Sequence, residues 1–344
     1  MAEKRSSAIV CCRTASMLMI VLCHIICYYP FIPGYNYLGD ILDSGVYSFL
    51  AISGYLYGRK SISSFDHWFR RRYLTVALPA TLLVLAVLTA EFCVGNHHSP
   101  IIILAYLLNL QGLGFLYGKF YRFFSEILVL GPLWFVTIIS LCYCLVPFLQ
   151  KYRERFRAWK YSFACILCTV PICYFLAVSS GFNVVHLLTF AIGYYLSAKN
   201  TLQPTRLSRF ALYSGVMLAF QILRLVLMAV CDGTAIYQNY ATYSHMVLGI
   251  WILYFFFAFE QYFPAVTDWL ANSRPITVGS DLSLYVYMTH FCFCRGPLNC
   301  FLLTNNLFLA TVAFLMATLI AALLLKKATE IVQTFLTSHS FPTV

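Results

Sequence analysis

An arginine and a histidine share the first apolar stretch of this 344-residue chain, where ionisable side chains are costly. Arg13 and His24 are eleven residues apart, close to three helical turns, so both side chains project from the same face of a helix. A neutral imidazole can act as a general base, and a guanidinium binds anions. The structural alternative is that Arg13 reaches the inner headgroups and His24 hydrogen-bonds a neighbouring helix.

A run of three arginines is the second candidate. Arg70, Arg71 and Arg72 precede an apolar stretch that contains Pro79. Guanidinium groups match the geometry of phosphate oxygens, so this run predicts a phosphate-binding site at the inner membrane face. The excess of basic residues in cytoplasmic segments explains the same run, and the two interpretations are compatible.

The second apolar stretch is rich in small residues. Gly45, Phe49 and Ser53 recur at four-residue spacing, and Tyr55 follows. Small residues at such intervals let two helix backbones approach closely. Taken alone, this pattern favours packing over a binding site.

A polar stripe marks a late apolar stretch near 282–302. Its members fall at i, i+4, i+7 and i+11, on one face of a helix: Ser283, Tyr287, His290 and Cys294. We expect this face to form an interior wall, with Tyr285 close by.

Two further residues stand out singly. Trp134 opens an apolar stretch soon after Glu126, and an interfacial tryptophan is typical of an aromatic belt. Arg224 lies inside another apolar stretch and needs water or a carboxylate partner. The candidate partners are Glu91, Asp40 and Asp43.

The composition indicates which elements must position these residues. Hydrophobic residues make up 61% of the chain and charged residues only 10%, which excludes an ordinary soluble fold. We therefore predict an all-α polytopic membrane protein. About ten stretches are long enough to cross the bilayer: 8–30, 41–58, 73–94, 127–149, 161–180, 182–198, 210–230, 243–262, 282–302 and 306–325.

The distribution of charge predicts the topology. The segment 100–118 is apolar at its start but contains Asn109, Gln111 and several glycines, so it spans, re-enters or lies at the interface. If it does not cross, most Lys and Arg residues fall on one side, with both termini cytoplasmic. The net charge of +11 then marks a basic membrane face rather than a nucleic-acid groove. We predict one transmembrane domain over residues 1–344, with a long cytoplasmic loop around 264–281.

Most of the fourteen cysteines lie within apolar runs, which indicates reduced thiols packed as small hydrophobic groups. The pairs Cys142/Cys144 and Cys292/Cys294 point to different sides of their helices, so we predict no metal site. P-loop, dinucleotide and zinc-protease motifs are absent from the sequence.

The order of these elements along the chain resembles the acyltransferase-3 family of integral membrane acyltransferases. The resemblance rests on the Arg13/His24 pair, the Gly45–Leu56 segment, the Phe69–Arg72 run, the Leu133–Val136 segment and the Ser283–His290 segment. It implies transfer of an acyl group, usually acetyl from acetyl-CoA, to a hydroxyl of a cell-envelope carbohydrate such as capsule, exopolysaccharide or lipopolysaccharide. By position, His24 matches the family's essential histidine and Arg13 its paired arginine. Where relatives often carry another arginine before the proline, this chain has Thr75-Val76-Ala77-Leu78.

The resemblance also implies a division of roles. The three arginines and Arg13 would hold the CoA phosphates, and His24 would act either as a general base or as a transiently acylated relay. The acceptor would contact wall residues drawn from Ser53, Tyr55, Glu126, Trp134, Tyr285, Tyr287 and His290. We expect a multi-pass protein of a bacterial cytoplasmic membrane, and both a monomer and a homo-oligomer are compatible with the sequence. A transporter or flippase of a lipid-linked sugar, or a sensor subunit, would use the same features, and loss of His24 would distinguish a sensor from an acyltransferase.

Overall fold

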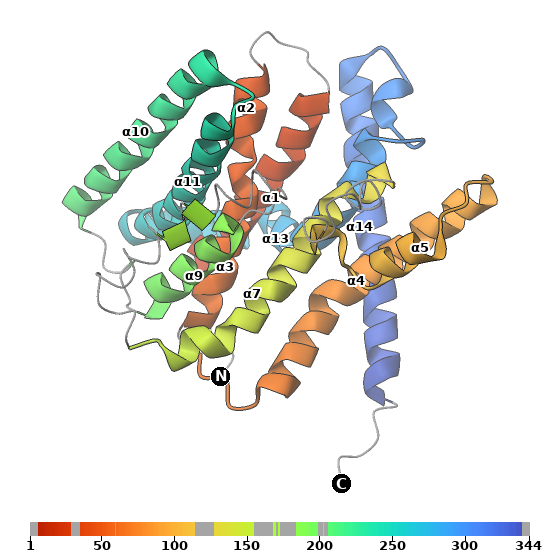
Figure 1. Ribbon diagram of the computed structural model, residues 1–344, viewed down its shortest axis with the longest axis horizontal. Coiled ribbons are helices and arrows are strands. Elements are labelled where there is room, and N and C mark those ends of the chain that lie inside the picture. The colour runs from red at the N-terminus through yellow and green to blue at the C-terminus, as the bar shows by residue number, and fades with distance from the viewer. Residues whose placement is uncertain are drawn as a thin grey trace. The chain divides into compact units, whose positions relative to one another are not determined.

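The computed structural model describes residues 6–28, 35–58, 60–113, 127–154, 168–169, 171–172, 184–198, 202 and 206–338. Every regular element within these ranges is a helix, as the all-α prediction expects (Figure 1). The chain forms two compact units. The first comprises Met1–Phe65 and Leu141–Asp281, and the second comprises Asp66–Ser140 and Leu282–Val344. The prediction of a single transmembrane domain stays a prediction.

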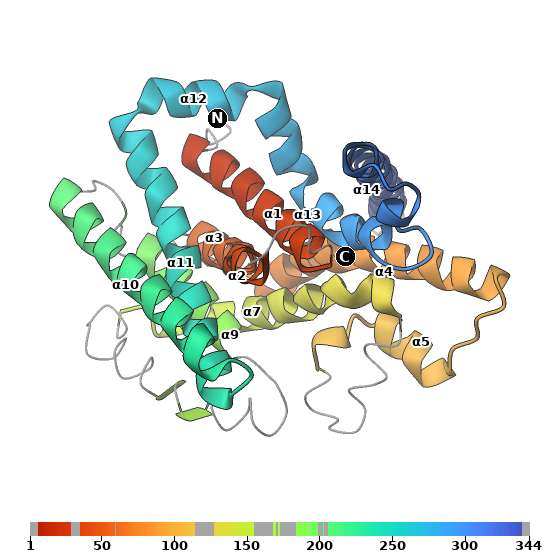
Figure 2. The same cartoon turned by 90° about the horizontal axis from the view of Figure 1, so that it is seen from above.

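The first unit is built around a short central helix. α3 packs against α1, α9 and α11, and α10 packs on the outside of α11 (Figures 1 and 2). α12 follows α11 and contacts α1, as the view in Figure 2 makes clear. The helices described in this unit are α1 (Ser7–Tyr28), α2 (Tyr35–Leu42), α3 (Ser44–Gly58), α9 (Val185–Ala198), α10 (Leu207–Cys231), α11 (Ala235–Tyr262) and α12 (Pro264–Asn272).

The second unit combines long apolar helices with short connecting turns. Two helices belong to both units, because the boundaries fall within α7 (Trp134–Lys151) and α13 (Arg274–Cys294). The other helices described here are α4 (Phe65–Cys93), α5 (Pro100–Leu107), the 3₁₀ helices η2 (Leu128–Leu133) and η4 (Cys300–Leu302), and α14 (Leu307–Ser338).

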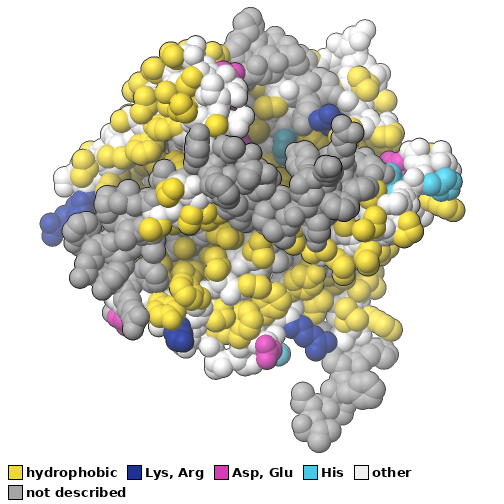
Figure 3. Space-filling view, in the orientation of Figure 1, with side chains coloured by type: hydrophobic (Ala, Val, Ile, Leu, Met, Phe, Trp, Pro, Cys, Tyr) yellow, Lys and Arg dark blue, Asp and Glu magenta, His cyan; other side chains and the backbone are white. Residues whose placement is uncertain are grey.

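Six helical segments in the described ranges are long and apolar enough to cross a membrane. They cover Ser7–Cys27, Phe65–Cys93, Leu128–Lys151, Leu207–Cys231, Ala235–Tyr262 and Leu307–Leu336. α10 and α14 turn many leucines and isoleucines outward, and hydrophobic side chains cover much of the described surface in Figure 3. Such a surface is stable in lipid rather than in water. The chain is a multi-pass membrane protein, and each of the six segments overlaps a predicted span.

Glycines allow the central helix α3 to pack closely. A Cβ at Gly45 would lie 2.6 Å from the backbone oxygen of Ser16 on α1, closer than real carbon atoms approach. Gly54 and Gly58 abut the backbone of α9 in the same way. The small-residue pattern therefore has a packing role at Gly45, whereas Phe49 and Ser53 are half-buried.

The ambiguous segment 100–118 begins as the short helix α5, which ends at Leu107. Asn109 then adopts a left-handed backbone conformation with φ of 56°, and its side-chain amide donates to Thr81 Oγ1 at 2.9 Å. The hydroxyl of Thr137 donates to the Asn109 carbonyl at 2.6 Å. This irregular backbone is thus hydrogen-bonded to α4 and α7, as non-helical backbone at membrane depth requires.

The segment around 264–281, expected as a cytoplasmic loop between two spans, is largely helical in the structure. α12 occupies Pro264–Asn272, and α13 begins at Arg274. Proline is well tolerated in the first helical turn, where its missing N–H has no helical partner, so Pro264 starts a helix instead of preventing one.

Candidate functional site

Two acidic side chains hold the start of α1, the helix that carries Arg13 and His24. The backbone N–H of Ala8 donates to Glu260 Oε1 at 3.1 Å, and Ser6 Oγ donates to the same carboxylate. Ser7 Oγ donates to Asp268. Carboxylates are favourable at a helix N-terminus, where N–H groups lack helical partners. α11 and α12 therefore fix the end of α1 nearest Arg13.

Arg13 and His24 are both half-buried. The neighbouring face of α1 packs on α3, where Ser16 Oγ donates to Ser48 Oγ at 2.8 Å. The helix that carries Arg13 and His24 therefore contacts the helix that carries the small-residue pattern directly. The catalytic roles of the two residues stay predictions.

The acceptor-binding candidates on α3 differ in exposure. Ser53 is half-buried, whereas Tyr55 is 9% exposed and its ring lies 4.8 Å from that of Phe257. Tyr55 belongs to the hydrophobic core that joins α1, α3 and α11. Most of its ring is therefore used for packing.

The arginine run lies in the second unit, on the first turns of α4. Arg70 and Arg71 are exposed, and Arg72 is half-buried. Thr75 Oγ1 donates to the Arg71 carbonyl at 2.7 Å, so the helix is continuous through the run. Two exposed guanidinium groups on one helical turn suit binding of phosphate oxygens.

The same unit brings the Trp134 motif and the polar stripe together. The hydroxyl of Tyr287 on α13 donates to the carbonyl of Pro132 at 2.6 Å, and its ring lies 5.3 Å from Phe135. Cys292 Sγ approaches the Val129 carbonyl at 3.9 Å. The η2 turn that precedes Trp134 thus packs on α13.

Burial of the polar stripe is confirmed. Ser283, Tyr287, His290 and Cys294 are each at most 4% exposed. One ring nitrogen of His290 lies 3.1 Å from the Val286 carbonyl. The stripe is an interior wall, as its periodicity predicts.

Two half-buried side chains, Trp134 and Tyr285, retain surface that a ligand can contact. Glu126 lies outside the described residues. The substrate-binding roles of all these residues stay predictions.

A network of charged side chains in the first unit surrounds a buried arginine. Arg224 on α10 is 1% exposed and forms an ion pair with Asp40 on α2, which is one of its three candidate partners from the sequence. His245 Nε2 lies 3.2 Å from Arg224 Nη2 and 3.5 Å from Asp40 Oδ1. Burial tends to raise the pKa of Asp40, but contact with His245 and the charge of Arg224 outweigh it and lower the pKa to about 2. Sequence reasoning missed His245, although a histidine within a predicted span was a signal.

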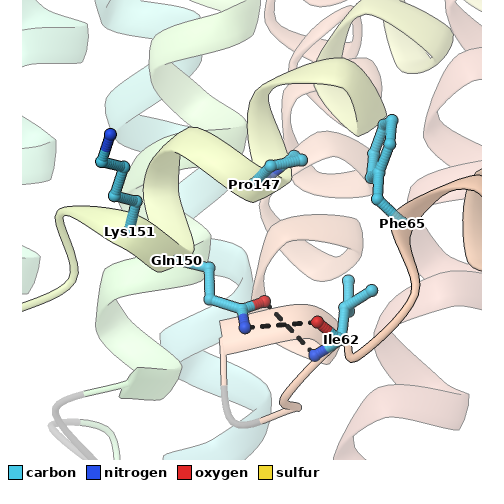
Figure 4. A pocket seen from close by; sticks show the side chains of 5 residues that line it. All are labelled: Ile62, Phe65, Pro147, Gln150 and Lys151. Atoms are coloured by element: carbon cyan, nitrogen blue, oxygen red, sulfur yellow. Dashed lines mark hydrogen bonds between the residues drawn. The ribbon is translucent and has the colours of Figure 1, made fainter.

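A small pocket of about 330 Å³ opens between the turn after α3 and the end of α7 (Figure 4). Ile62, Phe65, Pro147, Gln150 and Lys151 line it. The Gln150 amide accepts from the Ile62 N–H at 3.3 Å and donates to its carbonyl at 3.5 Å, which fixes the floor. The result is an apolar recess beside a cationic side chain.

The cysteines in the described ranges are free thiols, and about half of them are buried. The burial fits the prediction of thiols packed as small hydrophobic groups, and their redox state stays a prediction. The same residues contain no group of three His, Cys, Asp or Glu side chains placed to hold a metal ion.

Comparison with known proteins identifies the family to which the chain belongs. The acyltransferase-3 family model, described as an acyltransferase domain, matches residues 7–327, nearly the whole chain. No curated protein and no solved structure matches the chain. The match contains every candidate site residue, including the α1 pair, the arginine run and the polar stripe. The chain therefore belongs to the acyltransferase-3 family of membrane acyltransferases.

Proposed function

We propose that the protein transfers acetyl from cytoplasmic acetyl-CoA to a hydroxyl of a cell-envelope carbohydrate, such as capsule, exopolysaccharide or lipopolysaccharide. The observation that carries the proposal is the family match over 7–327 on a multi-pass helical scaffold. The donor, the acceptor and a bacterial cytoplasmic membrane location are part of the proposal.

We propose ten spans and two cytoplasmic termini, within one transmembrane domain. The short helix α5 supports this topology, because its eight residues rise about 12 Å and the hydrocarbon core is about 30 Å thick. A segment that does not cross leaves the basic residues before α4 and after α7 on one side. That side is the cytoplasmic face in the proposal, where acetyl-CoA is available.

Arg70, Arg71 and Arg72 are the proposed donor-binding residues, together with Arg13 near the cytoplasmic end of α1. The exposure of the first two supports phosphate binding. Since Thr75–Leu78 contain no arginine, the donor contacts on α4 are confined to its first turns.

His24 is the proposed catalytic base. It takes the proton of the acceptor hydroxyl while the hydroxyl oxygen attacks the thioester carbonyl carbon. The carbon–sulfur bond breaks, the electron pair leaves with sulfur, and the imidazolium returns the proton to the thiolate. The products are an ester and free CoA. In the alternative, His24 is acylated first and passes the acyl group to the acceptor.

The exposure of the wall residues supports an order among the proposed acceptor contacts. Ser53, Trp134 and Tyr285 are half-buried and have surface to offer a sugar. Tyr55, Tyr287 and His290 are almost fully buried, so they contribute mainly to packing and offer little surface to a sugar. Glu126 is proposed on its sequence position alone.

The test is an acetyl-transfer assay with purified protein, labelled acetyl-CoA and envelope glycan. We expect an O-acetylated product from the wild type and none from His24→Ala, which should stay folded. His97→Ala is the matched control, because that histidine is exposed beyond the end of α4. Transfer by His24→Ala at the wild-type rate would refute the role of His24, and no transfer by the wild type would refute the function.

A further inference from the structure

Arg224 is a buried arginine in the last third of the membrane helix α10. It lies about two turns before the end of α10 at Cys231, and only 1% of it is exposed. An arginine in a membrane span needs a compensating partner. The proposed acyl transfer does not use this residue, so its presence in a membrane span needs another explanation.

The groups around Arg224 come from three other helices. Asp40 on α2 forms the ion pair, and Tyr237 on α11 donates its hydroxyl to Asp40 Oδ2 at 2.8 Å. His245 on α11 lies beside this ion pair, with Nε2 3.2 Å from Arg224 Nη2, and contacts Ser44 Oγ on α3 through Nδ1 at 3.0 Å. The network therefore ties α2 and the start of α3 to the α10–α11 hairpin.

The guanidinium group is held on its own helix as well. Arg224 Nη1 donates to Gln221 Oε1 at 3.3 Å, and Gln221 Nε2 donates to the Ser244 carbonyl at 3.1 Å. The fork of arginine makes the contacts to Asp40, Gln221 and His245 together, which the single ammonium group of lysine does not reproduce.

Asp40 also borders the part of α1 that carries His24. The preceding residue, Gly39, packs on this part of α1, where a Cβ would lie 2.5 Å from Cys27 Sγ and 3.8 Å from the Cys23 carbonyl. At about 100° per residue, His24 lies about 60° around α1 from Cys27. The turn of α2 that Arg224 holds therefore borders the face of α1 that presents His24.

We propose that Arg224 is a positioning residue for acyl transfer: through Asp40 it holds α2 against the turn of α1 that carries His24. The inference rests on the proposed function, because it assigns the imidazole to catalysis. Misplacement of a catalytic group by about 1 Å can reduce a rate by roughly 100-fold. Arg224 contacts Asp40, Gln221 and His245, none of which is a proposed donor-binding residue, so its loss should affect turnover rather than donor binding.

The first experiment compares Arg224→Gln and Arg224→Lys with Ser214→Ala. The control removes another α10–α11 contact, in which Trp251 Nε1 donates to Ser214 Oγ at 2.9 Å, and leaves Asp40 untouched. We expect kcat to fall by about 10- to 100-fold in Arg224→Gln, with KM for acetyl-CoA within about twofold of wild type. Arg224→Lys keeps the positive charge, so it should fold. We expect its kcat to lie between that of Arg224→Gln and that of the wild type. Ser214→Ala should keep the wild-type kcat.

The second experiment needs no activity. In Gly39→Cys the new thiol can form a disulfide with Cys27, and mass spectrometry of oxidised protein measures its rate of formation. We expect the rate to fall at least severalfold when Arg224→Gln or Arg224→Lys is added, and to stay unchanged when Ser214→Ala is added. An unchanged rate in both Arg224 backgrounds would overturn the proposal.

The two experiments separate the possible failures. If the wild type shows no acyl transfer, the proposed function fails, and the disulfide rate alone decides whether Arg224 holds α2 against α1. If the wild type transfers acetyl and both Arg224 variants turn over as fast as Ser214→Ala, the positioning role is refuted. Should Arg224→Gln fail to fold, Arg224→Lys carries both measurements.

Discussion

Replacing Gly45 by alanine should destabilise the protein by forcing α1 and α3 apart. The added Cβ would lie 2.6 Å from the Ser16 carbonyl oxygen and 2.9 Å from Ile20 Cγ1. Ordinary contacts of this kind begin at 3.4 Å, so the helices must separate by up to 0.8 Å. The Ser16 carbonyl is part of α1 and cannot move without the helix.

The expected magnitude follows from two opposing effects. Overpacking of a tight contact costs about 1–3 kcal/mol, and a rigid backbone partner places this site at the upper end. Alanine recovers up to about 1 kcal/mol of helix propensity relative to glycine. We therefore expect Gly45→Ala to lower the free energy of unfolding by about 1–2 kcal/mol.

The matched control is Gly215→Ala on α10. A Cβ there meets no atom within 4 Å, so only the gain in helix propensity remains. The same chemical change should thus lower the stability at Gly45 and leave it unchanged or raise it at Gly215. Thermal unfolding in detergent, followed by circular dichroism, measures both. If Gly45→Ala were as stable as Gly215→Ala, the close approach of α1 and α3 would be refuted.

Three further predictions concern single contacts. Tyr287→Phe loses the hydrogen bond to the buried Pro132 carbonyl and should reduce stability by about 1–3 kcal/mol in a denaturant titration. Because the pKa of Asp40 is lowered to about 2, its charge stabilises the folded state fully above about pH 4, and this contribution is lost as the pH falls toward 2. The melting temperature of the wild type should therefore approach that of Asp40→Asn as the pH falls, and a constant difference would contradict the ion pair. Arg71→Ala should weaken acetyl-CoA binding in a calorimetric titration, whereas Arg209→Ala, an equally exposed arginine on α10, should not.

The pattern of hydrophobic residues was sufficient to predict the features that depend on the bilayer, namely the membrane spans and the buried polar face of α13. Six of the predicted spans coincide with long apolar helices in the described residues, because the length needed to cross a bilayer is independent of the neighbours. The polar stripe on α13 is buried for a similar reason. Its period places Ser283, Tyr287 and His290 on one face, and polar groups in a membrane protein turn inward.

Short sequence patterns were insufficient to predict the structure where the same residues are compatible with two different structures. The segment around 264–281 was expected as a loop because it lies between two predicted spans, but Pro264 occupies the first turn of the helix α12. Gly45 was identified as a packing residue, whereas Gly54 and Gly58, which approach α9, were not singled out. Small residues indicate that some backbone comes close without indicating which one.

The sequence was sufficient to predict a helical membrane protein, to show a motif order that resembles the acyltransferase-3 family, and to indicate that Arg224 needs water or a carboxylate partner. Only the tertiary structure selected Asp40 from three candidates and added His245 and Tyr237 to the same network. It also placed Tyr287 against Pro132, more than 150 residues away along the chain. The physical reason is that spacing along a helix fixes the face on which a side chain lies, while its partner depends on which helices pack together.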